Sequence, residues 1–328
     1  MLGVSSGVSH AESPAPAVPD VVAVVYEAEI VVDLDGAGIL GRERGVFGGA
    51  AGSREWALGP WRASWTAAEH AAAVAAVRRA IGRGDVYQVN LVGHASAPYR
   101  GDPLPALRRV TALPGAAYPI LLTGEGWAIA CASPETLLRL RFADRQLETL
   151  PIKGTRPATE QGRRELLASV KERAEHVMIV DLERNDLAQV AATGSVVVPS
   201  LFAVRRWCDL WQAESRVTAT LAPGVDLAGL LRAILPGGSV TGAPKLAALA
   251  QIAALEPVGR GPSMGALGVI DRDGIDLGLT IRTVAADDAR LHVWAGGGIT
   301  WGSDPDEEVA EAAAKAAPLI EALTHPTT

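Results

Sequence analysis

The chain has 328 residues, of which 48% are hydrophobic and 20% are charged, and this is enough apolar material for a large core. The formal net charge of −7 gives no electrostatic footprint for nucleic acid. The first residues show neither the basic start nor the long apolar stretch expected of a secretory signal, and no apolar run approaches the ~20 residues of a membrane span. We therefore predict a cytoplasmic enzyme of small molecules that binds neither nucleic acid nor membrane. Cys131 and Cys208 are interpreted as small buried apolar residues in a reducing cytosol.

The start of the chain differs in composition from the rest. Residues 1–20 are rich in Ser, Pro, Ala and Gly, which predicts a disordered N-terminal tail. Residues 21–328 are predicted to form a single catalytic domain. Within it, the Val-rich run at 21–32 is expected to supply strands, and the Gly-rich run at 36–59 is expected to form a loop.

Helices are predicted from capping and from hydrophobic periodicity. Thr66 and Glu69 form a capping box, so a helix is expected to start there and to run to about Gly82. Within the long helical segment at 165–190, the run at 177–180 is apolar all round and is expected to be buried. The predicted helices after the first cover residues 104–113, 165–190, 226–235, 245–255 and 307–323.

Short apolar or alternating runs predict strands between these helices. The predicted strands cover residues 86–92, 116–122, 127–132, 137–142, 146–152, 195–204, 207–221, 266–271, 278–284 and 291–295. Strands and helices are interspersed without the regular βαβ rhythm of a doubly wound sheet. The sequence therefore predicts an α+β fold.

A single lysine, Lys153, lies between an apolar strand end and a glycine-threonine turn in the segment 151–157. A lysine in such a place can pair with an anion as a point charge. In a partly desolvated pocket it can also lose its proton and act as a nucleophile or base. Taken alone, it could equally be an exposed loop residue.

Two pairs of glutamates have helical i, i+3 spacing: Glu172 with Glu175, and Glu308 with Glu311. Residues at this spacing share a helix face, so each pair projects its carboxylates together. Mg²⁺ would compensate such carboxylates and would leave coordination positions for an anionic substrate. The alternative is that both pairs are solvated helix faces.

Glycine-rich turns precede a predicted helix at 236–245 and follow a predicted strand at 295–299. Backbone N–H groups in such turns bind carboxylate or phosphate, although each turn taken alone is also ordinary loop geometry. Arg282, which we place on a strand, offers a bidentate fork for a further carboxylate. A metal site, carboxylate-binding elements and a lysine together suit a small dicarboxylate.

These motifs, in this order, resemble the chorismate-utilising enzymes, a family that includes anthranilate synthase component I, aminodeoxychorismate synthase component I, and the isochorismate and salicylate synthases. The resemblance covers about residues 60–325 and implies two layered antiparallel sheets flanked by helices, with the active site in the cleft between them. The matching segments are 84–91 (GDVYQVNL), 133–135 (SPE), 151–155 (PIKGT), 172–187 (ERAEHVMIVDLERNDL), 238–245 (GSVTGAPK), 281–283 (IRT), 296–299 (GGGI) and 303–305 (SDP).

The resemblance also implies roles for individual residues. Glu135 resembles the acid that assists departure of the ring C4 hydroxyl of chorismate, and Arg282 resembles the clamp on the enolpyruvyl carboxylate. Glu175 and Glu311 resemble ligands of Mg²⁺, the expected cofactor, with Glu172 and Glu308 as supporting carboxylates. The remaining residues expected to bind substrate are Thr155, Thr241, Gly242, Lys245, Gly297, Gly298 and Lys315.

The identity of residue 153 bears on the subclass. Anthranilate synthases usually carry alanine there, whereas aminodeoxychorismate synthases carry a lysine that attacks C2 of chorismate before ammonia enters at C4. The resemblance therefore implies aminodeoxychorismate synthase component I, which makes a precursor of 4-aminobenzoate and folate with ammonia from a separate glutaminase subunit. Gln88 stands where the water-adding isochorismate synthases place a lysine base. Because glutamine cannot activate water as a base, the resemblance does not favour that subclass.

Three residues depart from the family pattern. Gln212 replaces a usual histidine, Ser263 replaces a usual tyrosine beside the enolpyruvyl carboxylate, and Glu214 occupies a usually apolar position. Two alternatives therefore stay open. One is anthranilate synthase component I, which aminates C2, and the other is a catalytically silent chorismate-binding paralogue.

Overall fold

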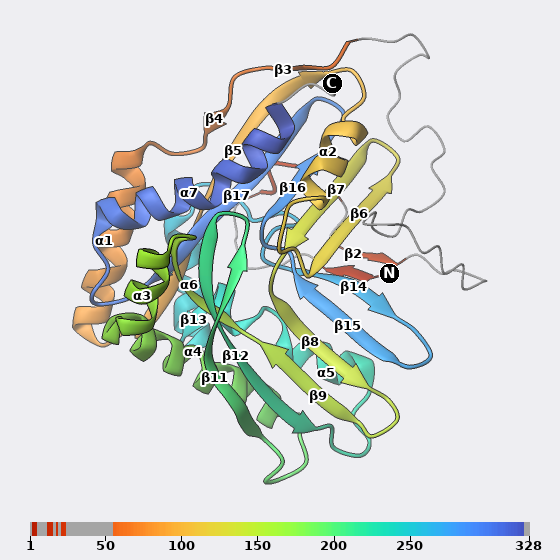
Figure 1. Ribbon diagram of the computed structural model, residues 1–328, viewed down its shortest axis with the longest axis vertical. Coiled ribbons are helices and arrows are strands. Elements are labelled where there is room, and N and C mark those ends of the chain that lie inside the picture. Colours follow the sequence, from red (N-terminus) through yellow and green to blue (C-terminus); the bar gives the residue numbers. More distant parts are fainter. Residues whose placement is uncertain (1, 5–11, 16–17, 19–20, 24–54, 325–328) are drawn as a thin grey trace.

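Two antiparallel β-sheets are layered on one another, and helices cover their outer sides (Figure 1). The structure is a computed structural model and describes residues 2–4, 12–15, 18, 21–23 and 55–324. In the described part of the chain every strand pair is antiparallel, so the predicted α+β class with two layered sheets is confirmed.

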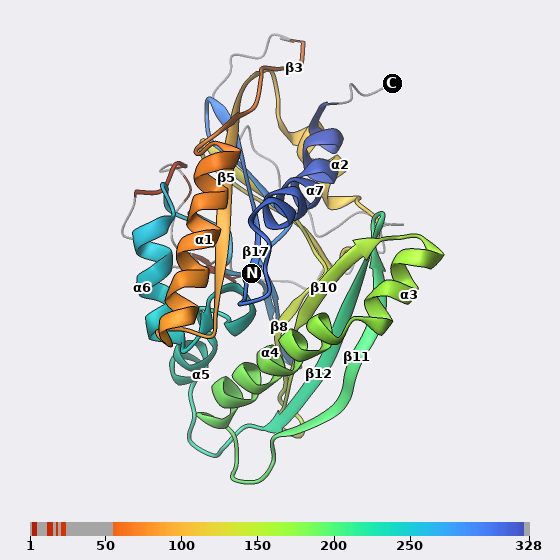
Figure 2. The same ribbon diagram turned by 90° about the vertical axis from the view of Figure 1, so that its left-hand side faces the viewer.

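One sheet has nine strands in the order β10-β12-β9-β8-β15-β14-β1-β2, with β11 paired to β12. Its long β11–β12 hairpin extends beyond the rest of the sheet and supports α3 and α4 (Figure 2). The strands are β1 Leu2–Val4, β2 Val21–Ala23, β8 Thr136–Arg141, β9 Gln146–Leu150, β10 Ile152–Pro157, β11 Val197–Trp207, β12 Leu210–Thr220, β14 Ala266–Ile270 and β15 Gly274–Leu279.

The second sheet has eight strands in the order β13-β5-β17-β16-β7-β6, with β3 and β4 paired to β5. Its centre is the pairing of β5 with β17, which holds register from Val89 opposite Ile299 to Pro98 opposite Arg290. The strands are β3 Ala57–Leu58, β4 Arg62–Ala63, β5 Gln88–Arg100, β6 Tyr118–Gly124, β7 Trp127–Ser133, β13 Gly242–Ala243, β16 Thr283–Ala286 and β17 Arg290–Ile299.

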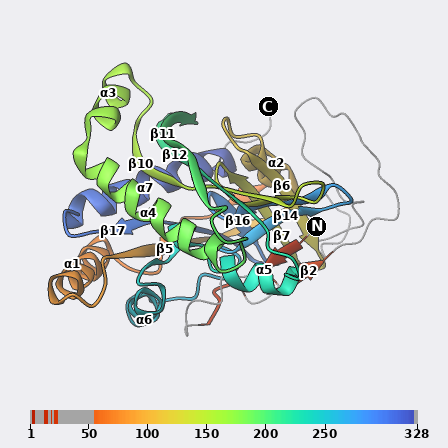
Figure 3. The ribbon, with the colours of Figure 1, turned by 90° about the horizontal axis from the view of Figure 1, so that it is seen from below.

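Helices pack on both sheets, and α4 and α6 lie on opposite sides of β5 and β17 when the molecule is seen from below (Figure 3). Among the described residues, no helix combines the length and apolar character needed to cross a membrane. The helices are α1 Ala67–Arg83, α2 Leu104–Thr111, α3 Glu160–Ala168, α4 Val170–Ala188, α5 Leu227–Ile234, α6 Lys245–Leu255 and α7 Pro305–Thr324, with a 3₁₀ turn η1 at Gly238–Val240.

The main hydrophobic core lies between the two sheets. It joins apolar side chains of the eight-stranded sheet, such as Ile120 and Ile129, to those of the nine-stranded sheet, such as Leu138 and Val217. Separate clusters lie under α2 and α7 and between β5 and the helices α1 and α6. This packing fixes both sheets and the inner faces of α4 and α7, which carry the site described below.

Some predictions about elements are wrong in informative ways. The segment at 165–190 is two helices, α3 and α4, because Ser169 is extended and caps α4 by accepting a hydrogen bond from the Glu172 N–H at 3.1 Å. Val177 is 49% exposed although its neighbours Ile179 and Val180 are buried, because a helix in this position buries only one face. Cys131 is buried as predicted, but Cys208 is only partly buried.

The chain start also differs from the prediction. Residues Leu2–Val4 pair with β14, and Ala15 and Val18 are buried in the main core, so the described parts of 1–20 are not a disordered tail. Of the predicted strand run at 21–32, the structure describes only residues 21–23, which form β2. Of the predicted loop at 36–59, it describes only residues 55–59, which include β3.

Candidate active site

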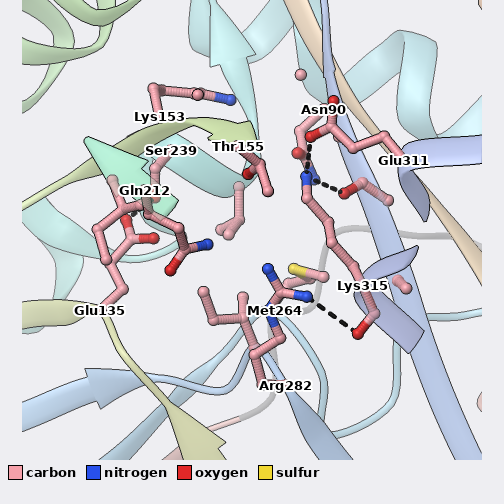
Figure 4. Close-up of a pocket in the computed structure, with 18 of the residues that line it drawn as sticks. Asn90, Glu135, Lys153, Thr155, Gln212, Ser239, Met264, Arg282, Glu311 and Lys315 are labelled. Carbon is pink, nitrogen blue, oxygen red and sulfur yellow. Dashed lines mark hydrogen bonds and ion pairs between the residues drawn. The ribbon is translucent and has the colours of Figure 1, made fainter. Parts of the chain in front are cut away.

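A cavity of about 110 Å³ lies where the two sheets meet, and α4 and α7 close its sides. Figure 4 shows Lys153, Gln212 and Glu135 on one side of an open space, and Arg282 and Lys315 on other sides of it. The predicted site residues that line the cavity are Lys153, Glu135, Thr155, Arg282, Gly297, Gly298, Lys315, Glu172, Glu175, Glu308 and Glu311.

Lys153 is positioned by a bulge in β10. The β10–β12 register shifts between Lys153 and Thr155, and Gly154 between them has φ +82, a conformation that favours glycine. A Cβ on Gly154 would also lie 2.8 Å from Leu166 and 2.9 Å from a Glu172 carboxylate oxygen. The glycine therefore lets β10 approach α3 and α4 closely while both Lys153 and Thr155 line the cavity.

The ammonium of Lys153 rests on the bare backbone of Gly298, where a Cβ would collide with it. Burial lowers the pKa of Lys153, and the positive charge of nearby Lys315 lowers it further. The glutamates of the same cavity act in the opposite direction without cancelling the shift. This environment favours the neutral, nucleophilic form of the amine more than water does.

Glu135 follows β7 and is only 4% exposed. Its carboxylate accepts a 2.6 Å hydrogen bond from the hydroxyl of Ser239, which belongs to η1 in the glycine-rich turn. Burial raises the pKa of Glu135 to about 7, although the Ser239 hydrogen bond and nearby Lys153 act to lower it. A carboxyl group with this pKa holds a proton at neutral pH part of the time, as a general acid must.

The inner face of α7 carries three charged side chains into the cavity. The Lys315 ammonium lies 2.5 Å from a Glu311 carboxylate oxygen and donates a 2.9 Å hydrogen bond to the Gly296 carbonyl. A Cβ on Gly297 would lie 3.0 Å from a Glu308 carboxylate oxygen, so this glycine makes room for the acidic face. Although burial acts to raise it, the adjacent Lys315 holds the pKa of Glu311 below its usual value.

Helix α4 supplies two glutamates from the opposite side. Glu172 forms an ion pair with Arg156 of β10, with 2.8 Å between the nearest atoms. Glu175 accepts a 2.6 Å hydrogen bond from the hydroxyl of Thr300, just after β17. The i, i+3 spacing seen in the sequence thus places both carboxylates at the cavity, as it does for Glu308 and Glu311 on α7.

The donor set suits Mg²⁺, which takes carboxylate oxygens and usually needs only one or two of them besides substrate and water. The four carboxylates nevertheless do not form a closed cage. Within the described ranges, no three His, Cys, Asp or Glu side chains converge tightly enough to hold an ion alone. An ion in this cavity would therefore need oxygen ligands from a bound anion or water besides the carboxylates of α4 and α7.

Arg282 is not on a strand as predicted but in the turn between β15 and β16, with φ +51. Its guanidinium lies over the Trp207 ring, 4.3 Å from the centroid, and donates a 3.0 Å hydrogen bond to the Lys315 carbonyl. Burial lowers its pKa to about 10, so it stays a cation at neutral pH. A strained backbone held by such contacts is typical of a ligand clamp.

Three predicted substrate-binding residues do not line the cavity. The Thr241 hydroxyl donates to the Gly237 carbonyl at 2.9 Å, and Gly242, with φ +149, packs against the backbone of Gln88. The Lys245 ammonium lies 2.6 Å from Asp186 and donates to the Pro236 carbonyl at 3.0 Å. These contacts hold the glycine-rich turn in place, and the three residues do not line the cavity.

The two departures nearest the expected substrate are placed differently. Gln212 lines the cavity from β12, as expected for a residue beside the ring. Ser263 is buried and does not line the cavity, and its hydroxyl reaches only the Thr280 carbonyl at 3.4 Å. Glu214 lies on β12, an inner strand, and its carboxylate oxygen is 2.6 Å from Nε of Arg205 on β11. This ion pair accounts for a carboxylate at that position.

Several residues at the site were not predicted. Asn90 and Ser239 line the cavity, and both lie inside motifs that the sequence had marked, so their polar side chains were the available signal. Gln88 is buried beside Gly298, and in the described structure neither its amide oxygen nor its nitrogen has a hydrogen-bond partner. The amide of Gln88 is therefore a buried polar group that the described structure leaves unsatisfied.

Comparison with known proteins agrees with this geometry. Residues 49–321 match the family described as chorismate binding enzyme. The chain belongs to that family. This confirms the resemblance that the sequence motifs indicated, and the fold is shared with solved members. The computed structure aligns with anthranilate synthase component I of Streptococcus pneumoniae at a TM-score of 0.72 and 31% identity, covering 79% of this chain and 59% of that one.

The most similar curated relatives include two kinds of enzyme. The chain is 40% identical over 271 residues to anthranilate synthase component 1 of Streptomyces coelicolor, covering 80% of this chain and 53% of the relative. It is 39% identical over 258 residues to aminodeoxychorismate synthase component 1 of Salmonella typhimurium, covering 76% and 56%. The chain thus spans about half the length of these relatives, and similarity alone does not choose between the two activities.

Proposed function

We propose that this chorismate-binding protein is an aminodeoxychorismate synthase component I, which replaces the C4 hydroxyl of chorismate with an amino group. The observation that carries the proposal is Lys153, a lysine with a lowered pKa that faces the same cavity as the buried acid Glu135. A nucleophilic amine and a proton donor in one cavity are what a displacement of a ring hydroxyl requires.

In the proposed reaction, the neutral amine of Lys153 forms a bond to C2 of chorismate as the C4–O bond breaks. Glu135 gives its proton to the departing hydroxyl, which leaves as water. Ammonia then forms a bond at C4 while the bond from Lys153 to C2 breaks and the ring double bonds return. Arg282 holds one substrate carboxylate through its N–H fork.

The acidic faces of α4 and α7 would hold Mg²⁺ through Glu175 and Glu311, with Glu172 and Glu308 in support. The ion would neutralise the ring carboxylate, which otherwise meets four glutamates. Lys315 already offsets part of the charge of Glu311. The chain's own task is therefore to fix the carboxylate pair on each helix so that substrate and ion bind together.

Ammonia is expected to come from a separate glutaminase subunit. The relatives are named component 1, which supports a second component for this chain as well. The substrate, the partner and a cytoplasmic location are all part of the proposal.

Anthranilate synthase component I is the second candidate, because the Streptomyces coelicolor relative at 40% identity carries that name. It would use the same cavity but would aminate C2 and release pyruvate. Lys153 would then occupy the place where the amine must enter, which favours the first proposal.

Product identity decides between these candidates. The protein is incubated with chorismate, Mg²⁺ and an ammonium salt, and products are separated and identified by mass. We expect 4-amino-4-deoxychorismate from the wild type and at least a hundredfold loss of it in Lys153→Ala, since removal of a covalent nucleophile costs several kcal/mol. Arg164→Ala on α3 is the control, because Arg164 is an exposed cation that does not line the cavity. Anthranilate as the main wild-type product would favour the second candidate, and no turnover at any chorismate concentration would favour a silent paralogue.

A further inference from the structure

A second cavity, of about 210 Å³, lies on the other side of α7 from the active site. We call it the α1–α7 pocket. Its walls are mostly small apolar side chains. Its walls include Trp65, His70 and His94, together with Val309, Ala312 and Ala313 from α7.

The aromatic wall of this pocket is built from Trp65 and His70. Their rings stack 4.4 Å apart at 15°, and His70 is only 5% exposed. A Cβ at position 93 would lie 2.6 Å from Nε1 of Trp65, so Gly93 lets the indole lie flat on β5. In the part of the chain that is described, the His70 ring nitrogens have no hydrogen-bond partner, which leaves them available to a guest.

The second histidine of the pocket, His94, is fully engaged. Its Nδ1 lies 2.5 Å from the Ser64 hydroxyl, and its Nε2 lies 3.1 Å from Nδ1 of His292, whose Nε2 lies 3.2 Å from Asp287. Burial lowers the pKa of His94 to about 3, so the ring is neutral. His94 therefore contributes an uncharged wall, and His70 is the polar group that can recognise a ligand.

We propose that the α1–α7 pocket binds a small, neutral aromatic molecule with one hydrogen-bonding group, and that its occupancy is transmitted to the active site. The size fits, because an apolar cavity of about 150 Å³ holds benzene and this one is larger. No Lys, Arg, Asp or Glu is among the described residues that line it, so the pocket offers a charged ligand no ion-pair partner. The ring would pack on Trp65, and its N–H or O–H would meet His70.

The route of transmission is the pair of elements that both cavities share. Helix α7 presents Val309 and Ala312 to the α1–α7 pocket and Glu311 and Lys315 to the active site. On β17, Ala295 lines both cavities. A guest that fixes α7 against β17 therefore acts on the same helix that places the Glu311 carboxylate.

A ring contact provides a second link. The Trp294 ring lines the active-site cavity, and its centroid lies 5.0 Å from that of His94, which lines the α1–α7 pocket. His94 thus lines one cavity and packs against a residue that lines the other. A shift of its ring would therefore change the packing on both sides of β17.

The binding test uses 5-fluoroindole, a neutral ring with one N–H, followed by ¹⁹F NMR on the whole chain. We expect binding to the wild type, at least tenfold weaker binding to Ala313→Leu, which fills the pocket from α7, and about fivefold weaker binding to His70→Phe. Ala314→Leu is the control, because Ala314 is exposed on the same helix and does not line the pocket. The charged analogue 5-fluoroindole-2-carboxylate should bind at least tenfold more weakly than 5-fluoroindole.

Absence of 5-fluoroindole binding at about 1 mM would overturn the site. Equal affinities for Ala313→Leu and Ala314→Leu, or equal binding of the carboxylate, would do the same. Transmission is tested by equilibrium dialysis of chorismate with and without saturating 5-fluoroindole, and we expect a change of about fivefold or more in its affinity. An unchanged affinity would overturn the transmission. Both measurements are equilibrium binding, so they do not depend on whether the protein aminates chorismate.

Discussion

At the scale of single residues, burial acts on Lys153 and Glu135 in complementary ways. Removal from water disfavours the charged form of any group, so it lowers the pKa of the lysine and raises that of the carboxyl to about 7. Both groups therefore move toward their neutral forms in the same cavity. Those are the forms that a nucleophilic amine and a proton donor need, and one low-dielectric wall supplies both.

This pairing predicts a specific pH dependence. Glu135 can donate a proton only below its folded pKa of about 7, so its contribution should be present at lower pH and lost as pH rises through 7. The ratio of kcat/KM for wild type to that for Glu135→Gln should therefore fall between pH 6 and pH 8. Glu135 also acts on the pKa of Lys153, so the titration of the lysine is read from the Glu135→Gln profile itself, in which the acid is absent. A ratio that stays constant across this range would mean that Glu135 is not the acid.

The buried amide of Gln88 leads to a prediction for stability. This amide has no hydrogen-bond partner in the described structure, which costs about 1–3 kcal/mol. Gln88→Met should therefore raise the free energy of unfolding by about 1–3 kcal/mol, because it replaces the unsatisfied amide with an apolar group of similar size. Denaturant unfolding measures this change. Unchanged stability would show that the amide is satisfied by solvent.

At the scale of elements, features that depend on neighbouring residues could be predicted from the sequence, whereas features that depend on tertiary packing could not. The Thr66–Glu69 capping box starts α1 as expected, because a cap depends only on neighbouring residues. The i, i+3 glutamates reach the cavity because helical spacing is also local. The break at Ser169 was missed, because the chain leaves the helix there to pack α3 and α4 separately against the nine-stranded sheet.

Lys245 shows the same limit within a motif. Its place at the start of α6, after a glycine-rich turn, suggested anion binding, and no local property separates that role from an ion pair with the buried Asp186. Arg282 was assigned to a strand because its neighbours are apolar or β-branched. Only the docking of the two sheets on each other turns the chain at that residue.

The pairing of α4 with α7 predicts how metal binding depends on both helices. Glu175→Gln or Glu311→Gln should each weaken Mg²⁺ binding in the presence of chorismate by about tenfold or more, because each removes one of the two protein ligands that we propose. Chorismate affinity should fall in parallel. Glu307→Gln is the control, since Glu307 is exposed on α7 and does not line the cavity. Titration calorimetry measures both affinities, and full activity in excess EDTA would contradict the metal requirement.

At the scale of the whole molecule, the site depends on the contact between the two sheets. Trp207 ends β11 of the nine-stranded sheet, and its Nε1 donates a 3.0 Å hydrogen bond to the Ala132 carbonyl of β7 in the other sheet. The Arg282 guanidinium lies on the face of this same indole. The residue that joins the sheets is thus also the platform for the proposed carboxylate clamp.

This arrangement leads to a prediction for Arg282. Because the Ser263 side chain does not line the cavity, we expect Arg282 to make the proposed contact with the enolpyruvyl carboxylate through its planar fork. Arg282→Lys should raise KM for chorismate about tenfold or more, since an ammonium cannot make the bidentate contact or stack on Trp207 in the same way. The free energy of unfolding should change less than the KM does, because the lysine stem still fills much of the space.

A matched variant separates the clamp from its platform. Trp207→Phe keeps an aromatic face for the guanidinium but removes the N–H bond to Ala132, so it should cost about 1–3 kcal/mol of stability and raise KM only slightly. Steady-state kinetics give KM for chorismate, and denaturant unfolding gives the free energy of unfolding, for both variants. If Arg282→Lys left KM unchanged while Trp207→Phe raised it, the carboxylate would be held by residues packed on the indole, and Arg282 would serve only to join α7 to the sheets.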